Sequence, residues 1–318
     1  MTAGAPPGAG AAPWYGGGLW RRVLSGLGVL VLALLVASYL GAVHGLGDSL
    51  AVLRPGLAAA AVVAGGLLWF ARRRRAGVIM VAAGLIAGAP IVGSSLPAGA
   101  EGEYAYTTYQ KNLSFRLADP APLIADIAGH GPDFVTLQEV TDRTRAVMAG
   151  LVVGLPSQHL CPFAAVGGVA VLSRWPKIAG TERCAEGDGS AAMQVATPDG
   201  PVWIVSLHLH WPFPYRQPEQ LRRLIPALAA MDGPIVIGGD FNMVPWSHAL
   251  AAITRATGSE RAGAVTYSLP MAGGWVTLPI DHVLVPRGGG PTRARRLPLL
   301  GSDHHGVLAG FDLARRSR

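Results

Sequence analysis

Three long apolar runs occupy the first third of the chain. They cover residues 23–47, 50–71 and 76–100, and Arg54 is the only charged residue inside them. Each run is long enough for a helix to cross the hydrocarbon core of a bilayer, which takes about 20 apolar residues, and such helices tolerate the Gly and Pro present here. A buried helical hairpin is the alternative, but three successive runs would need a very large partner core. We therefore expect three transmembrane helices.

The Arg residues around these runs predict their orientation. Arg21 and Arg22 precede the first run, and four Arg occupy residues 72–75, whereas the loop at 44–49 has no Lys or Arg. Because short cytoplasmic flanks are enriched in Lys and Arg, we expect a cytoplasmic N-terminus and an extracytoplasmic location for everything after residue 100. A cleavable signal peptide fits the first run poorly, since that run is too long and further spans follow. Cleavage after Ala100 is left open.

From residue 101 the pattern changes to short apolar runs of strand type that alternate with stretches of helical periodicity. Such alternation is typical of an α/β or α+β domain. Strands are expected at 104–113, 133–140, 168–174, 191–197, 201–209, 234–239, 279–285 and 306–311, and helices at 122–130, 217–231 and 246–256. The chain is thus divided into a flexible tail at 1–18, a membrane unit at 19–100 with helices near 23–47, 50–71 and 76–97, and a second domain at 101–318.

Composition and charge support this division. Half of the residues are hydrophobic and only 14% are charged, against roughly a quarter charged in soluble proteins. Residues 1–100 hold seven Lys or Arg and one acid, Asp48, which gives +6, whereas residues 101–318 hold 19 bases and 18 acids, which gives +1 and completes the total of +7. The basic excess therefore belongs to the flanks of the membrane helices and is weak evidence for nucleic acid binding. Residues 101–286 carry 12 bases and 16 acids and are net acidic.

Several of the expected strands end in, or lead into, polar residues of a catalytic kind. In chain order these are Asn112, Glu139, His208, Asp240 with Asn242, Asp281, and Asp303 with His304. A rigid sheet can hold side chains at its strand ends around one cleft. One polar residue at a strand end has little meaning, since it often marks the exit from the core. Six such ends in order predict a common site.

The same residues lie in short motifs whose order resembles that of the endonuclease/exonuclease/phosphatase superfamily. The motifs are Lys111-Asn112-Leu113, Leu137-Gln138-Glu139, Ser173-Arg174-Trp175-Pro176, Leu207-His208-Leu209, Gly239-Asp240-Phe241-Asn242, Ile280-Asp281-His282-Val283 and Ser302-Asp303-His304. The superfamily includes deoxyribonuclease I-like and exonuclease III-like nucleases and bacterial sphingomyelinases. The resemblance covers about residues 104–312. It implies a phosphoric ester hydrolase with a four-layer α/β (α+β) sandwich of two mixed β-sheets flanked by helices, here preceded by an all-α transmembrane unit.

The resemblance implies a divalent metal site. Glu139 is the implied main ligand, with Asn112 beside it and Asp303 as a further ligand. Such oxygen and amide ligands suit Mg²⁺ or Mn²⁺ rather than zinc. A hard cation would polarise a phosphoryl oxygen and offset the negative charge that repels a nucleophile.

The resemblance also implies which residues act on water and phosphate. His304 would be the general base that takes a proton from water, and Asp281 would orient its ring through the other ring nitrogen. Asp240 and Asn242 would position the nucleophile and the phosphate. His208 would hydrogen-bond a phosphate oxygen as charge develops.

Further residues have weaker signals. Arg174, Trp211 and Tyr215 are candidates for substrate binding. Arg174 could instead form a structural ion pair, and Trp211 and Tyr215 could instead belong to a packed loop. Cys161 and Cys184 lie 23 positions apart. Outside the cytoplasm they are able to form a disulfide, and two unpaired buried thiols are the alternative.

These observations predict a multi-pass membrane protein whose extracytoplasmic domain is a metal-dependent hydrolase of phosphodiester or phosphomonoester bonds. The expected mechanism is in-line attack of water with a His–Asp general base. The expected partners are a phosphoester and the lipid bilayer, and no protein partner is inferable. Lipid headgroup, nucleotide and nucleic acid substrates are left open, as is the oligomeric state. The alternatives are a secreted-face nuclease of the same superfamily and a non-catalytic binding or signalling module with a degenerate site.

Overall fold

A computed structural model describes residues 16–96, 102–185 and 187–313 of the chain. The expected N-terminal tail lies almost wholly outside the described residues, as does the possible cleavage site before residue 101. The chain divides into two compact units. One comprises the residues up to Val36 together with Arg54–Ala89, and the other comprises Ala37–Leu53 together with the chain from Pro90 onward. The second unit thus includes a segment whose sequence resembles membrane helix.

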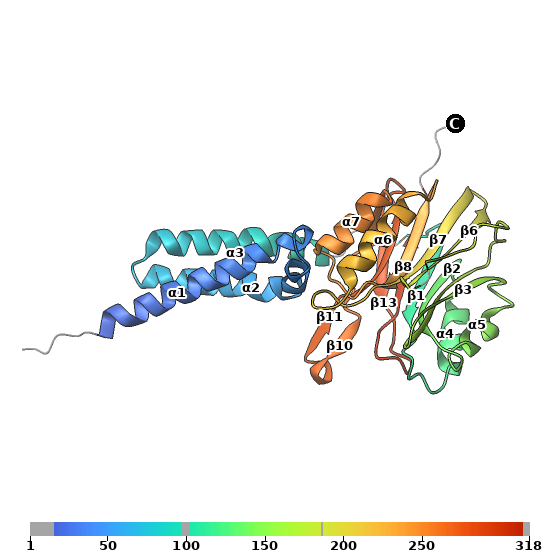
Figure 1. The fold of residues 1–318 in the computed structure, drawn as a ribbon, viewed down its shortest axis with the longest axis horizontal. Coiled ribbons are helices and arrows are strands. Elements are labelled where there is room, and N and C mark those ends of the chain that lie inside the picture. Colours follow the sequence, from blue (N-terminus) through green and yellow to red (C-terminus); the bar gives the residue numbers. More distant parts are fainter. Residues whose placement is uncertain (1–15, 97–101, 186, 314–318) are drawn as a thin grey trace, which may run out of the picture. The chain divides into compact units, whose positions relative to one another are not determined.

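Three helices carry the apolar runs. They are α1 (Gly16–Ala37), α2 (Leu46–Phe70) and α3 (Arg74–Ser95), and each is long and apolar enough to cross a membrane (Figure 1). Helices α2 and α3 approach closely at Gly65 and Gly77. A Cβ atom at Gly65 would lie only 2.7 Å from the carbonyl oxygen of Gly77. Small residues permit this kind of contact between membrane helices. The three helices indicate an association with membranes.

The first helix is shorter than the apolar run predicts. The chain leaves α1 after Ala37 and forms a 3-10 turn, η1 (Leu40–Ala42), before α2 begins at Leu46. Gly41 and Gly45 lie in this stretch, and glycine disfavours helix. The connection is therefore a structured loop of the second unit and not a continuation of α1 to residue 47.

The second unit contains two six-stranded mixed sheets. The first is built from β1 (Tyr106–Asn112), β2 (Phe134–Val140), β3 (Ser157–Ala164), β4 (Gly167–Ser173), β13 (Arg293–Arg296) and β14 (Val307–Phe311), in the order β13-β14-β1-β2-β4-β3. The second is built from β5 (Arg183–Ala185), β6 (Ser190–Thr197), β7 (Gly200–His208), β8 (Ile235–Asp240), β9 (Ser259–Arg261) and β12 (Asp281–Pro286), in the order β5-β6-β7-β8-β12-β9. A separate hairpin pairs β10 (Leu269–Met271) with β11 (Val276–Leu278) around the turn η2 (Ala272–Gly274).

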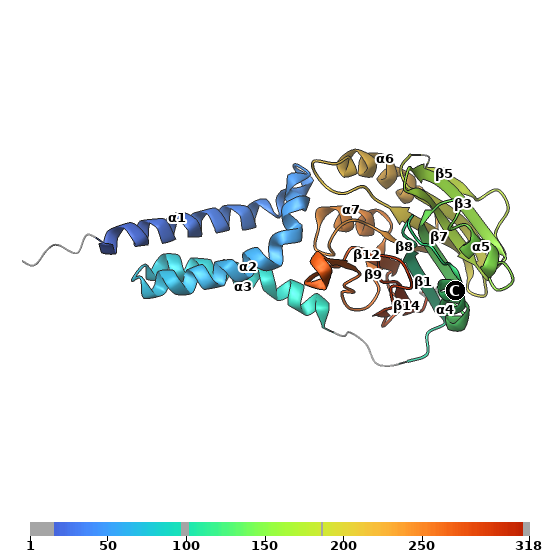
Figure 2. The ribbon, with the colours of Figure 1, turned by 90° about the horizontal axis from the view of Figure 1, so that it is seen from below.

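Helices cover the outer face of each sheet (Figures 1 and 2). Helices α4 (Ala121–His130) and α5 (Ala146–Leu151) share an apolar core with the first sheet, and α6 (Gln217–Ala229) and α7 (His248–Ala256) share one with the second. The inner faces of the sheets meet in a third core, which includes Phe134, Val171, Ile204 and Val236. The layers therefore run helix, sheet, sheet, helix, which confirms the predicted four-layer sandwich.

The register of the central strands brings the polar strand ends together. Strands β1 and β2 are parallel, and Asn112 lies beside Gln138. Strands β7 and β8 are also parallel, and His208 lies beside Asp240. Strand β12 runs antiparallel to β8 and places its first residue, Asp281, on the other side of Asp240. Three polar residues of the second sheet are thus neighbours on adjacent strands.

A disulfide joins the edges of the two sheets. Cys161 of β3 and Cys184 of β5 are bridged, with Cα atoms 5.4 Å apart, which confirms the predicted pair. Strands β3 and β5 are the terminal strands of their sheets, so the bridge ties one sheet to the other. In the chain-entropy account, closing a loop of this size stabilises the fold by roughly 3 kcal/mol.

Candidate active site

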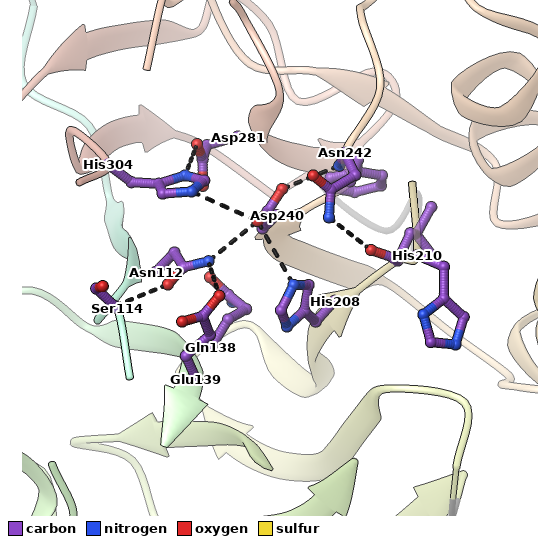
Figure 3. Close-up of polar contacts among 12 residues, drawn as sticks. Asn112, Ser114, Gln138, Glu139, His208, His210, Asp240, Asn242, Asp281 and His304 are labelled. Carbon is purple, nitrogen blue, oxygen red and sulfur yellow. Dashed lines mark hydrogen bonds and ion pairs between the residues drawn. The ribbon is translucent and has the colours of Figure 1, made fainter. Parts of the chain in front are cut away.

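The polar strand ends of both sheets meet in one cleft of ≈410 Å³. The residues that line it include Glu139, Phe163, His208, His210, Trp211, Tyr215, Asp240, Asn242, Leu269, Asp303 and His304. Asn112 and Asp281 do not line the cleft, but both are fully buried and hydrogen-bond residues that do (Figure 3). The structure therefore brings together all eight residues predicted to bind metal or to act in catalysis.

His304 and Asp281 form a buried pair. His304 Nδ1 lies 2.8 Å from Asp281 Oδ2, and the other Asp281 oxygen accepts a hydrogen bond of 2.9 Å from Gln110 Nε2. Burial opposes ionisation of Asp281, but the neighbouring His304 outweighs it and holds the pKa of the carboxyl below its usual range. An ionised Asp281 accepts a hydrogen bond from the Nδ1–H group of His304, so the second ring nitrogen, Nε2, is left facing the cleft.

Asp240 is the hub of the cluster (Figure 3). Its Oδ2 atom lies 3.8 Å from His304 Nε2 and 3.6 Å from His208 Nε2, and it accepts a hydrogen bond of 3.0 Å from Asn112 Nδ2. Its Oδ1 atom accepts a hydrogen bond of 2.9 Å from the Asn242 backbone N–H. Burial raises the pKa of Asp240 to about 7. Charge at this carboxylate is therefore costly unless positive charge lies nearby.

Glu139 reaches the cleft through an irregularity in β2. The register of β2 against β4 shifts between Gln138 and Val140, so Glu139 lies in a β-bulge, and its φ of +58° is in the left-handed region. Bulges re-aim side chains next to active sites, and a non-glycine residue in this region costs on the order of 1–3 kcal/mol. Its carboxylate accepts hydrogen bonds from the Phe115 N–H at 2.7 Å and from Asn112 Nδ2 at 3.2 Å.

The oxygen donors fit a divalent cation. One amide, that of Asn112, contacts the carboxylates of both Glu139 and Asp240, which come from different sheets. Two carboxylates this close repel each other unless a cation or a proton offsets their charge. Carboxylate oxygens are ligands that Mg²⁺ and Mn²⁺ prefer. Asn112 turns its NH₂ group toward the two carboxylates, and its amide oxygen accepts a hydrogen bond of 2.9 Å from the Ser114 N–H. Ligand atoms of Asp240, Asp281 and His304 also lie within 4.8 Å of one another.

His208 and Asn242 occupy the side of the cleft away from Asp281. Burial lowers the pKa of His208 to about 4, so its ring is neutral at physiological pH. Its Nδ1 atom is buried and has no hydrogen-bond partner within the part of the chain that the structure describes. Asn242 has a φ of +47° and donates from its side chain to the Leu209 carbonyl at 2.7 Å.

The remaining predicted residues divide between the cleft and the opposite end of the sheet. Asp303 is exposed at the cleft, and Trp211 and Tyr215 line it. Their roles as metal ligand and substrate contacts stay predictions. Arg174 follows β4 at the far end of β2 from Glu139, where it contacts the Gly131 carbonyl and pairs with Asp133 at 3.5 Å. Its assignment to substrate binding is corrected to a structural ion pair.

The sequence did not indicate a second layer of buried polar residues. Gln110 Nε2 bridges Asp281 and Gln138, and Gln138 in turn donates to Ser206 Oγ at 2.9 Å. Lys111 is fully buried, and its Nζ donates to the carbonyls of Leu299 at 2.8 Å and His304 at 2.6 Å. The available signal was the occurrence of Gln and Lys at positions inside apolar strands.

The fold and the cleft together define a phosphoric ester hydrolase. The family model described as Endonuclease/Exonuclease/phosphatase family matches residues 110–304, more than half of the chain. The chain therefore belongs to this family.

Solved structures share the fold. Humanized D. rerio TDP2 with 14 mutations is 15% identical with a TM-score of 0.52, and covers 65% of this chain and 99% of its own. Truncated Caenorhabditis elegans TDP2 is 16% identical with a TM-score of 0.51, and covers 65% and 97%. A family protein from Leptotrichia buccalis is 12% identical with a TM-score of 0.52, and covers 66% and 100%. A comparison with curated proteins found no match.

Proposed function

We propose that the protein is a membrane-anchored, divalent-metal-dependent hydrolase of phosphodiester or phosphomonoester bonds, with its cleft on the extracytoplasmic side. The observation that carries this proposal is the convergence of the His304–Asp281 pair with Asp240, Asn112 and Glu139 in one cleft. A base, its orienting carboxylate and a set of oxygen donors are the groups that metal-assisted hydrolysis requires.

His304 acts as the general base in this proposal. In the neutral ring, the hydrogen bond to Asp281 keeps the proton on Nδ1, so the lone pair of Nε2 faces Asp240 Oδ2 across 3.8 Å. A water that hydrogen-bonds to both groups gives one proton to Nε2 as its oxygen forms a bond to phosphorus. The bond from phosphorus to the leaving oxygen breaks on the opposite side.

The other residues bind the phosphate and offset its charge. Glu139 and Asp240 would hold a Mg²⁺ or Mn²⁺ ion, which would supply positive charge to the phosphoryl and leaving oxygens. The Asn112 amide, which donates to both carboxylates, would hold them in place. His208 lines the cleft, and its Nε2 atom lies 3.6 Å from Asp240 Oδ2, so its ring would donate a hydrogen bond to a phosphate oxygen from this side.

An envelope phosphoester, such as a lipid headgroup, is the substrate class that this chain favours. The three apolar helices would anchor the catalytic domain to a bilayer. Residues 101–286 carry 12 bases and 16 acids, and the whole domain at 101–318 has a net charge of only +1, which is a weak electrostatic attraction for the phosphate backbone of nucleic acids. A nuclease is the second candidate, because the family is described as one of endonucleases and exonucleases as well as phosphatases.

Hydrolysis is expected to stop when divalent cations are removed. The full chain in detergent would be tested with phospholipids, sphingomyelin, inositol phosphates, nucleic acids and aryl phosphodiesters. We expect at least one substrate to be cleaved, with activity lost in excess EDTA and restored by Mg²⁺ or Mn²⁺, since Glu139 and Asp240 need a cation between them. Undiminished cleavage after complete chelation would contradict the metal assignment.

Topology and redox state can be tested together. A reporter fused after Arg318 is expected to be active only if it is of the type that works outside the cytoplasm, because the two Arg clusters predict that orientation. Labelling of intact cells should find Cys161 and Cys184 blocked until a reductant is added. An active cytoplasmic reporter would refute the orientation, whereas an exterior reporter with freely labelled thiols would refute only the disulfide.

A further inference from the structure

Asp48, the only acid in the first hundred residues, accepts hydrogen bonds from the N-terminus of α7. It lies in the first turn of α2, and its side chain is only 5% exposed. Its carboxylate accepts hydrogen bonds from the backbone N–H groups of His248 at 2.7 Å and Ala249 at 3.0 Å. These are the first two residues of α7, whose N–H groups have no partner within the helix. A carboxylate is also favoured there by the helix dipole.

Neighbours of Asp48 make further contacts with the second unit. Ser49 Oγ donates to the Phe213 carbonyl at 2.6 Å, and Trp246 Nε1 donates to the Ala51 carbonyl at 2.7 Å. Ala51 is fully buried in the same apolar core as residues of α6 and α7. The ring of His44 lies 5.0 Å from that of Phe213. The two residues in each of these contacts are 164 to 201 positions apart in the sequence.

Two glycines make this close packing possible. A Cβ atom at Gly41 would lie 2.4 Å from the Asp48 carboxylate and 2.8 Å from His248 Cβ. A Cβ atom at Gly45 would lie 2.8 Å from Pro218 Cγ. Real Cβ atoms do not approach this closely, so any other residue at these positions would push the loop away.

The contacted residues belong to the two loops that border the active site. Phe213 lies between His210 and α6, in the loop whose Trp211 and Tyr215 line the cleft. Trp246 lies between Asn242 and α7, in the loop that follows β8. A displacement of either loop would therefore shift residues that line the cleft.

We propose that residues 41–53, the docking segment, are a working part of the catalytic unit. The segment comprises the end of the connection between α1 and α2 and the first two turns of α2. It holds the loop 211–216 and the stretch 241–249 in the conformation that the cleft requires. Asp48 is its main positioning residue. The catalytic machinery is consequently not confined to the chain after residue 100. The kinetic part of this inference rests on the proposed hydrolase activity, and its structural part does not.

Hydrogen exchange on the full chain in detergent tests the structural part. In Asp48→Ala, exchange in peptides that cover 241–249 is expected to rise by about tenfold, since a lost helix-capping acceptor has an effect of this order. Asp48→Asn, which keeps one acceptor oxygen, should show a smaller increase. Gly45→Ala should loosen 211–216. Gly93→Ala is the matched control, because a Cβ atom there meets nothing within 4 Å.

Kinetics then separate positioning from a loss of folded protein. If the docking segment positions the cleft loops, Asp48→Ala and Gly45→Ala should raise the KM for a soluble phosphoester by about tenfold. A smaller folded fraction would lower kcat at an unchanged KM. Unchanged exchange in both variants, or a fall in kcat with KM unaltered, would overturn the proposal. If no phosphoester is cleaved at all, the proposed function fails, and the exchange measurements still decide the role of the segment.

Discussion

Replacing His304 with alanine is expected to lower kcat by about 10²–10⁴-fold while KM changes little, because the loss of a general base acts on the chemical step. The ring is held by Asp281 at Nδ1, and Nε2 is the atom left to receive a proton. His130→Ala is the control, since His130 lies at the end of α4 and pairs with Asp126. Near-normal turnover in His304→Ala would show that another group deprotonates water.

The pH dependence gives the same prediction a second measurement. Burial alone would lower the pKa of His304, but the charges of Asp281 and Asp240 outweigh it and raise the pKa to about 10. A base acts only in its neutral form, so kcat should rise with pH as the ring loses its proton. Asp281→Asn removes a charge that stabilises the imidazolium and thus lowers the pKa. In Asp281→Asn, the rise of kcat with pH should therefore occur at lower pH than in the wild-type enzyme, although the maximal kcat falls. A rise at the same pH as in the wild type would contradict the assignment.

Glu139→Gln is expected to raise the Mg²⁺ concentration needed for half-maximal activity by at least 10–100-fold, roughly the effect of losing a supporting group at a metal site. The substitution removes the charge but keeps the shape and one oxygen. We also expect Mg²⁺ or Mn²⁺ to raise the Tm of the wild-type chain, because a cation that binds only the folded state stabilises it, and this increase should be smaller in Glu139→Gln.

Glu182→Gln is a suitable control for that experiment. Glu182 pairs with Lys177 at 2.6 Å and does not line the cleft, so its loss should leave both the activity and the metal-dependent rise in Tm unchanged. If Glu139→Gln kept the wild-type metal response while Glu182→Gln altered it, the cation would have to bind elsewhere.

The active site was predictable because its residues lie at the ends of central strands. An apolar strand that terminates in a polar residue is visible in the sequence. Strands β1 and β2 are parallel, as are β7 and β8, so the polar ends of each pair lie at the same end of their sheet. Arg174 shows the limit of this reasoning. It also follows an apolar strand, but β4 runs antiparallel to β2, so its last residue emerges at the end opposite to Glu139. The sequence indicates a strand and not its direction.

Other features depend on contacts that the local pattern does not encode. Strands β5, β9, β10, β11 and β13 are only three or four residues long, too short for a clear alternation of apolar and polar residues. The docking segment reads as membrane helix because Ala51 and its neighbours are apolar. Burial in a protein core and burial in lipid select the same residues, and contacts such as those of Asp48, Ser49 and Ala51 with the second unit distinguish them.

Because the active site depends on the register of β12 against β8, catalytic activity indicates whether the chain has folded correctly. Asp281 and Asp240 are opposite each other in that register, and successive residues of a strand point to opposite faces. A slip of one residue would therefore turn Asp281 away from His304 while leaving the content of secondary structure almost unchanged. Such a misassembled chain would have the circular dichroism of the native protein and no competent base. Specific activity, rather than helix or strand content, is thus the appropriate measure of correctly refolded material.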